Sequence, residues 1–140
     1  MYFTPNNNPW CNNCSLYRQR DKDTKAVHTY AHTSFNNILL FILASYPGAK
    51  EEKEGLGLVG ESGKALNQAI NTVMKDILLP KCYQPFLNYV AKGNILRCNP
   101  KKETITKVHR NACKVWLNND LSAMHPQVPI LACGSEAKMA

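Results

Sequence analysis

The sequence predicts a single α/β domain with a mostly parallel central sheet flanked by helices. Two observations support this fold class. Continuous apolar runs, typical of strands buried on both faces, alternate along the chain with stretches of helical periodicity. A length of 140 residues with 44% apolar content suits one compact domain, and no repeat or linker interrupts the alternation. Sheets of this kind bind ligands at the carboxyl ends of their strands.

The first half of the chain supplies a polar segment, a strand and a helix. Residues 1–25 are polar and rich in asparagine, so we expect an irregular loop. Residues 38–44 are continuously apolar and predict a buried strand that ends at the turn 46–48. From Gly63 onward, apolar pairs recur every four residues and predict a helix that Pro80 ends.

The second half of the chain continues the alternation. Residues 86–91 predict a weaker strand, which a loop over 94–100 follows. Residues 128–133 predict another buried strand. Between them we expect a helix whose apolar face carries Ile105, Val108, Ala112, Val115 and Trp116.

Four of the six cysteines make a complete ligand set for a metal centre. Cys11 and Cys14 form a tight Cys-x-x-Cys pair, and Cys98 and Cys113 are distant from it in sequence. Thiolates in this arrangement suit tetrahedral zinc or an iron–sulfur cluster, and the spacing does not choose between them. Because no secretion leader opens the sequence, metal or reduced thiols are favoured over a disulfide framework, although the other two cysteines leave a disulfide open.

The positive charge of the chain is concentrated in one segment. Between Lys92 and Lys114, seven basic residues stand against one acid, Glu103, so this segment carries +6 of the net charge of +7. Such a patch predicts a phosphate-binding surface, because each neutralised phosphate releases condensed counterions. The alternative is a solubilising face without a specific partner.

The sequence also bears on location. It opens with no basic and apolar leader, and no apolar run reaches the roughly 18 residues that a membrane span needs. We therefore expect a protein of the reducing cytoplasm that has no membrane partner.

The segments around the cysteines form recognisable motifs. The first pair lies in Pro-Trp-Cys-Asn-Asn-Cys at 9–14, and the third cysteine lies in Asn-Ile-Leu-Arg-Cys-Asn-Pro at 94–100. Between them, Pro-Gly at 47–48 precedes two glutamates and the motif Leu-Val-Gly-Glu-Ser-Gly at 58–63. A weaker motif, a strand leading to Cys-Gly-Ser-Glu-Ala, spans 126–137. In this order the motifs resemble the iron–sulfur uracil-DNA glycosylases, families 4 and 5 of the uracil-DNA glycosylase superfamily.

The resemblance implies a cofactor and a set of DNA contacts. A four-iron four-sulfur cluster, with zinc as the alternative, would join residues 1–25 to the 94–116 region through the four cysteines. In the family, a Pro-Gly turn supplies backbone groups near a flipped nucleotide, and the asparagine that corresponds to Asn94 reads the base edge. Trp10 is expected to cover the cluster, and stacking on a base is the alternative. The residues implied to contact DNA or the base are Tyr46, Pro47, Gly48, Leu58, Asn94, Arg97, Lys101 and Lys102.

The chain departs from the family pattern at positions that matter for catalysis. Ser45 stands where the family has a glutamate, so a carboxylate is missing, and Leu58 replaces a stacking phenylalanine. The family's further strand and His-Pro-Ser motif have no counterpart, so we expect a fold truncated at its C-terminus. Glu51 and Glu52 match an acidic pair of the family, although the charged run that contains them is typical of a solvated loop.

The sequence therefore predicts a uracil-DNA glycosylase-like iron–sulfur protein that acts on DNA. The missing catalytic positions favour a degenerate protein that serves as a DNA-binding or accessory module in replication or repair. One alternative is an active small glycosylase that excises uracil, in which Ser45, Glu51 or Glu52 would assist hydrolysis. A second alternative is a zinc-stabilised domain that binds DNA or protein. A truncated sheet would also expose an edge for self-association or for a protein partner.

Overall fold

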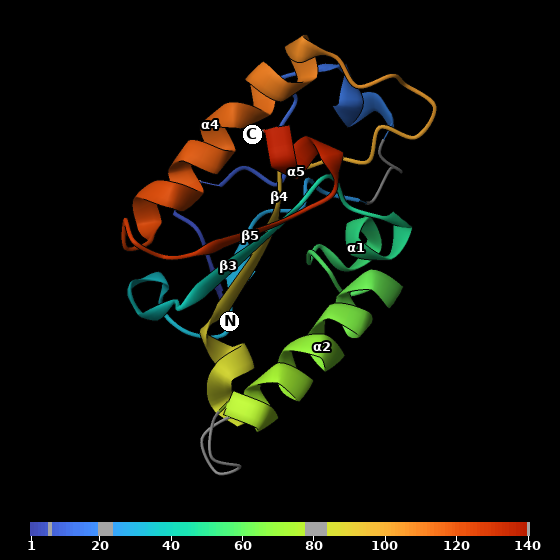
Figure 1. Cartoon of the computed structure of the whole chain (residues 1–140). Coiled ribbons are helices and arrows are strands. Elements are labelled where there is room, and N and C mark those ends of the chain that lie inside the picture. Colours follow the sequence, from blue (N-terminus) through green and yellow to red (C-terminus); the bar gives the residue numbers. More distant parts are fainter. Residues whose placement is uncertain (6, 20–23, 78–83, 140) are drawn as a thin grey trace.

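A computed structural model of the chain describes residues 1–5, 7–19, 24–77 and 84–139. Its centre is a five-stranded sheet, with helices on both sides of it (Figure 1). The predicted helix end at Pro80 lies outside the described residues, as does Cys82. Within the described residues, no helix has the length and apolar character needed to span a bilayer.

The sheet is mixed, with strand order β1-β2-β4-β3-β5. β3 (Leu40–Ala44) pairs in parallel with both β4 (Val90–Asn94) and β5 (Ile130–Cys133). β2 (Tyr30–Ala31) runs antiparallel to β4 and to β1 (Tyr2–Phe3). The expectation of a mostly parallel sheet therefore describes only the three central strands. The two antiparallel strands are two residues long, which is too short for a run or an alternation to predict them.

Among the described residues, four helices flank the sheet. α1 (Ala49–Glu54) and α2 (Glu61–Ile77) follow β3, α4 (Lys107–Ala123) follows β4, and α5 (Ser135–Met139) follows β5. The shorter 3-10 turns are Ser15–Gln19, Phe35–Asn37 and Gln84–Tyr89.

Two cores lie on opposite sides of the sheet, because successive residues of a strand point to opposite faces. Phe41 and Leu43 belong to the larger core, which includes Cys113 of α4 and which we call the α4 core. Ile42 belongs to a smaller core with Ile70 of α2, which we call the α2 core. In Figure 1, α4 and α2 accordingly lie on either side of the strands.

Three predicted elements are present with shifted ends. The strand expected at 38–44 is β3, the helix expected from Gly63 is α2, and the strand expected at 128–133 is β5. The expected burial of the last strand is wrong, because β5 lies at the edge of the sheet and its first two residues are exposed. The strand expected at 86–91 is wrong in its first part, because a 3-10 turn occupies residues up to Tyr89 and β4 begins at Val90.

The buried face of α4 matches the expected one only in part, since Trp116 and the preceding Ile105 pack against the α4 core. Val108 and Val115 are 70% and 51% exposed, so they do not face the sheet. His109, Cys113 and Asp120 are the buried residues of this helix. An apolar periodicity missed this face because two of its three buried residues are polar.

The charged run after β3 is a helix rather than a solvated loop. It forms α1, which Gly55 ends in the left-handed conformation, with φ of 73°. Glu52 points inward and is only 4% exposed. The expectation of a solvated run was wrong because it ignored the partner that Glu52 finds across the chain.

Candidate functional site

The carboxyl ends of the parallel strands β3 and β4 lie side by side. Ala44 is the register partner of Asn94, the last residue of β4. Just beyond the strands, the Ile95 N–H donates to the Ala44 carbonyl and the Leu96 N–H to the Ser45 carbonyl, each at 2.9 Å. This pairing brings the turn 46–48 next to Asn94, at the edge where parallel sheets bind ligands.

Asn94 is the most informative residue at this edge. Its side chain is 1% exposed, and its Nδ2 donor has no hydrogen-bond partner among the described residues. A Cβ added at Gly57 would lie 3.1 Å from this Nδ2, so the backbone approaches the amide closely. A buried donor without an acceptor costs about 1–3 kcal/mol, and such groups call for an explanation. Asn94 thus presents an unmet donor at the expected ligand edge.

Glu51 and Glu52 are both engaged by backbone amides. Glu51 Oε1 accepts from the Gly60 N–H at 2.8 Å, and Glu52 Oε1 accepts from the Asn99 N–H at 3.0 Å. The Asn99 side-chain amide in turn donates to the Pro47 carbonyl at 2.9 Å. The two carboxylates therefore connect the turn after β3 to the two loops around it, and this is their role in the structure.

The remaining predicted residues of this edge differ in exposure. Ser45 is half-buried, and a Cβ added at Gly134 would lie 2.4 Å from its Oγ, so it packs against the β5–α5 turn. Tyr46 is 44% exposed. Leu58 has a positive φ of 56° and packs against the α2 core. Its side chain therefore contributes to packing in that core.

The four predicted cysteine ligands come together. Cys11, Cys14, Cys98 and Cys113 line one small cavity of about 10 Å³, which is also lined by Asn13, Leu16, Tyr17 and Arg97. They arrive from the N-terminal segment, the loop after β4, and α4. No disulfide joins the cysteines that the structure describes. Within the same residues, no three His, Cys, Asp or Glu side chains form a group that could hold a single metal ion. That finding does not bear on a cluster, in which several iron atoms share the cysteines.

The cavity raises the cost of thiolate charge. Burial raises the pKa of the Cys113 thiol to about 11, while a backbone hydrogen bond from Arg97 acts in the opposite direction. Burial also raises the pKa of Cys14. Thiolates in such a place need a compensating cation, and a metal or cluster supplies one when it binds. The four cysteines line one cavity, and they are the residues that would hold a cysteine-ligated group.

Arg97 is not a surface residue, which corrects its expected role in DNA contact. Its side chain is 1% exposed, and it forms an ion pair with the equally buried Asp120 of α4. Its Nη1 donates to Thr29 Oγ1 at 3.0 Å, and the Thr29 hydroxyl donates to Asp120 Oδ2 at 2.5 Å. Arg97 therefore joins the loop that carries Cys98 to α4, and its guanidinium pairs with Asp120 instead of facing the protein surface.

The basic residues between Lys92 and Lys114 include some that are paired within the protein and some that are exposed. Lys92 donates to Asn67 Oδ1 at 2.9 Å, and burial lowers its pKa. Arg110 donates to both carboxylate oxygens of Glu136, at 2.6 and 3.0 Å. The exposed cations of the segment are Lys101, Lys102, Lys107 and Lys114. The basic surface is therefore smaller than the sequence count indicates.

Sequence reasoning missed a polar cluster beside the cysteines. The Ser15 hydroxyl donates to Glu103 and lies 3.0 Å from His109 Nε2, which also contacts Glu103 Oε1 at 3.0 Å. The cluster resembles a nucleophile with its base, but His109 Nδ1 accepts from the Thr106 N–H at 3.0 Å. The ring hydrogen of neutral His109 is thus on Nε2, so His109 cannot take the Ser15 proton. The cluster connects the Cys-x-x-Cys loop to the start of α4.

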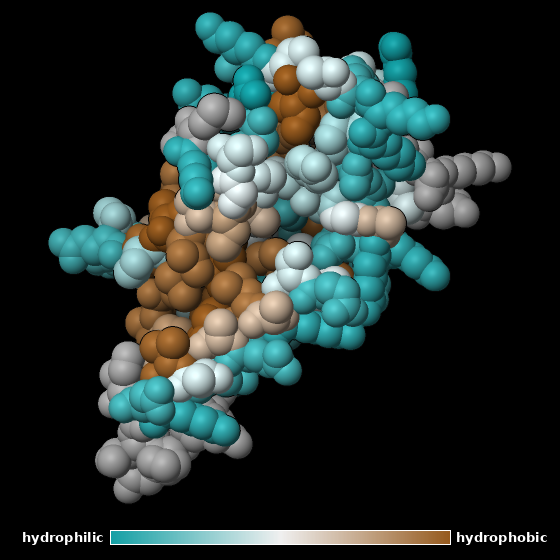
Figure 2. Space-filling view, turned by 45° about the vertical axis from the view of Figure 1, so that its right-hand side comes forward, coloured by the Kyte–Doolittle hydropathy of each residue, from teal (hydrophilic) through white to brown (hydrophobic). Residues whose placement is uncertain are grey.

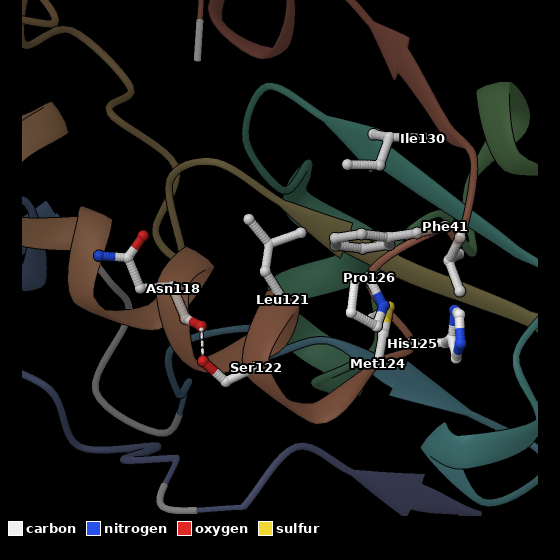
Figure 3. Close-up of a pocket in the computed structure, with 9 residues that line it drawn as sticks. Phe41, Asn118, Leu121, Ser122, Met124, His125, Pro126 and Ile130 are labelled. Atoms are coloured by element: carbon white, nitrogen blue, oxygen red, sulfur yellow. Dashed lines mark hydrogen bonds between the residues drawn. The ribbon is translucent and has the colours of Figure 1, made fainter.

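The structure also has a large apolar cavity away from the carboxyl edge. Its volume is about 530 Å³, and its lining includes Phe41, Leu121, Met124 and Ile130 (Figure 3). Phe41 and Ile130 lie at the amino ends of β3 and β5, so the cavity is at the opposite end of the sheet from Asn94. The only hydrogen bond drawn among its lining residues runs within α4, from Ser122 to the Asn118 carbonyl.

A comparison with protein-family models finds no match for this chain, and a comparison with curated protein sequences finds none either.

Proposed function

We propose that this protein is a uracil-DNA glycosylase-like iron–sulfur protein that binds DNA and holds a uracil base at Asn94 without efficient hydrolysis. It would then serve as a DNA-binding or accessory module in replication or repair. The observation that carries the proposal is the buried Nδ2 of Asn94, an unpartnered donor at the carboxyl edge of the sheet, which a base reaches once the Gly57 backbone beside it moves aside.

The chemistry of Asn94 suits one class of base. An amide N–H donates to a carbonyl oxygen, and uracil carries such an oxygen where cytosine carries an amino group. Cytosine would therefore place its amino group, a donor, against the Asn94 N–H, which is also a donor. A flipped base is read through these edge contacts after it leaves the stack. The site thus favours uracil over cytosine.

The groups near Asn94 support binding more than hydrolysis. Hydrolysis of a glycosidic bond generally needs a carboxylate that orients water or stabilises the sugar cation. Glu51 and Glu52 each engage a backbone N–H, and Ser45 stands where the family has a glutamate. Turnover by Glu51 is the second candidate function, because only one of its two oxygens accepts the Gly60 N–H.

The cysteine cavity supports the cofactor part of the proposal. A four-iron four-sulfur cluster on Cys11, Cys14, Cys98 and Cys113 would connect three separate parts of the chain. Its task is structural, because it fixes the Cys-x-x-Cys loop beside the loop that carries Lys101 and Lys102. Zinc is the alternative, and iron and sulfide analysis of protein purified without oxygen separates the two.

The test compares single strands of equal length that carry one uracil or one cytosine, bound by wild-type protein and by Asn94→Ala. We expect wild type to prefer uracil by roughly tenfold, since about 1.4 kcal/mol from one desolvated hydrogen bond is a factor of ten. Asn94→Ala should remove the preference. Asn118→Ala, a change of an exposed amide on α4, is the matched control and should retain it.

Two results would change the conclusion. Equal affinity of wild type for the two strands means that Asn94 does not read the base. Alkali-sensitive sites formed in the uracil strand mean that hydrolysis survives, and Glu51→Gln then tests whether that carboxylate supports it.

A further inference from the structure

Two exposed aromatic rings flank the Cys-x-x-Cys loop. Trp10 precedes Cys11 and is 60% exposed, and Tyr17 follows Cys14 and is 37% exposed. The expectation that Trp10 covers the metal centre is therefore wrong, because its ring faces solvent and does not line the cysteine cavity. A large exposed apolar ring is an informative observation, since such rings are usually at least half buried.

Each ring has a cation over it. Lys25 Nζ lies 5.2 Å from the centroid of the Trp10 ring, and Arg18 Cζ lies 5.6 Å from the centroid of the Tyr17 ring. Arg18 also donates to the Tyr17 hydroxyl at 3.5 Å. These distances are within the range of cation–π contacts. The Cys-x-x-Cys loop is therefore flanked by two pairs, each made of one aromatic ring and one cation.

The surroundings extend this surface. A cavity of about 290 Å³ adjoins Trp10 through Pro9 and Lys25, and its other lining residues are Phe3, Asn7, Ala26, His28, Glu54 and Gly55. The hydrogen bond from Ser15 to Glu103 places the Tyr17 turn beside the loop that carries the exposed Lys101 and Lys102. With a net charge of +7 on the chain, the surface is complementary to a polyanion that carries flat apolar groups.

We propose that Trp10, Tyr17, Arg18 and Lys25 form a binding surface for single-stranded DNA. Bases stack on the two rings, and the phosphates between them lie near the two cations. Alternating aromatic and basic contacts of this kind are how proteins hold single strands without reading their sequence. A duplex keeps its base faces stacked inside, so it offers these rings only its phosphates. The inference rests on the DNA binding proposed above and adds the form of the strand.

The first experiment measures binding by the cluster-loaded protein to three probes of about 16 nucleotides, the upper site size of single-strand modules. The probes are an oligothymidylate, a strand of abasic nucleotides with the same phosphates, and a duplex. We expect the oligothymidylate to bind at least tenfold more tightly than the abasic strand. Trp10→Ala should weaken the oligothymidylate about tenfold and leave the abasic strand unchanged, since one stacked base accounts for this difference.

Two variants serve as controls for the ring. Trp10→Phe keeps an aromatic face and should restore most of the affinity. Val108→Ala removes a comparably exposed apolar side chain from α4 and should not change binding. Quenching of tryptophan fluorescence by the oligothymidylate should be lost in Trp10→Ala, because the other tryptophan, Trp116, lies half-buried against the α4 core.

The cations give an independent readout. Lys25→Gln and Arg18→Gln should each reduce the slope of log affinity against log salt by about 0.7, the contribution of one phosphate contact on a single strand. The same change should occur with the abasic strand, since it retains the phosphates.

The outcomes separate this inference from the proposed function. Unchanged oligothymidylate affinity in Trp10→Ala, equal binding of the abasic strand by wild type, or preference for the duplex would each overturn the stacking surface, even if Asn94 still selects uracil. Loss of uracil selection with intact Trp10-dependent binding would overturn only the role of Asn94. No binding of the oligothymidylate by wild type would overturn both.

Discussion

The two sides of the sheet are stabilised in different ways. The α4 side combines its apolar core with buried polar partners, of which the ion pair between Arg97 and Asp120 is the clearest. The α2 side has a small apolar core around Ile42, Ile70 and Val90. A hydrogen bond from Lys92 of β4 to Asn67 of α2 also joins this helix to the sheet. One side depends on particular partners, and the other depends on apolar area.

This difference predicts how each side responds to substitution. Apolar contacts are non-directional, so a core tolerates changes that keep its volume. A buried polar or ionic group instead loses its compensation as soon as its partner is removed. We therefore expect large, local effects on the α4 side and graded effects on the α2 side.

The largest effect should follow from removing a cysteine ligand. Cys98→Ala should lose bound iron and open the N-terminal segment, because the energy of metal binding is also folding energy for its ligands. Hydrogen exchange should show lost protection in the turn Ser15–Gln19 and retained protection in α2. Cys133→Ala, a change outside the cavity, is the control. A Cys98→Ala protein with full iron content would mean that the ligand set is different.

The next largest effect should follow from Asp120→Ala. Arg97 would remain buried without its carboxylate, which costs about 3–5 kcal/mol. Urea unfolding followed by circular dichroism measures this loss. Asp76→Ala removes an exposed carboxylate from α2 and should change the free energy of unfolding by no more than about 0.5 kcal/mol. A loss in Asp120→Ala equal to that of the control would remove the ion pair as the feature that distinguishes the two sides.

A smaller effect is expected in the α2 core. Ile42→Val removes one methylene from a fully buried residue and should cost about 1 kcal/mol. The same unfolding experiment measures it, and DNA binding should be unchanged because the residue lies on the side away from the cysteines. A loss of unfolding free energy as large as that of Asp120→Ala would contradict the expected difference between the two sides of the sheet.

The smallest effect concerns pH. The hydrogen bonds from Arg110 hold the pKa of Glu136 below its usual range. A carboxyl whose pKa is lowered by folding stabilises the protein at any pH above its pKa in the unfolded chain, which is about 4.3. This contribution is lost as the pH falls through the pKa of the folded protein. Glu136→Gln should therefore be slightly less stable than wild type at pH 7, because ion pairs near the surface contribute little, and equally stable in acid. An unchanged difference between pH 7 and pH 3 would contradict this assignment.

The same contrast explains what the sequence could predict. β3 and α2 follow from apolar patterns, because each buries apolar side chains. The apolar run of β5 also forms a strand, but Ile130 and Leu131 stay exposed in it. The buried partners of the α4 side left no pattern, since Arg97 and Asp120 are 23 positions apart and each resembles a surface residue in sequence. The sequence therefore predicts Arg97 on the DNA surface, and it places the exposed Val108 and Val115 on the apolar face of α4 while identifying Trp116 correctly.

Some features of the candidate site could be predicted from the sequence, and others are visible only in the structure. The motifs identified the cysteines, and the structure brings all four to one cavity, while the cofactor itself remains a prediction. The position of Asn94 follows from its place at the end of a parallel strand, but its unpartnered Nδ2 is a property of packing alone. The exposure of Trp10 was missed because a tryptophan in a sequence gives no sign of which way its ring faces.

The edge strand β5 has a consequence for handling this protein. β5 pairs only with β3 among the described strands, and its Ile130 and Leu131 are 48% and 41% exposed. Figure 2 shows apolar residues gathered on this face of the molecule. An open apolar strand is a template for association, and mutual repulsion between chains of net charge +7 opposes it. Salt screens that repulsion, so concentrated solutions should aggregate more at high ionic strength, the condition that also releases nucleic acid from a basic surface.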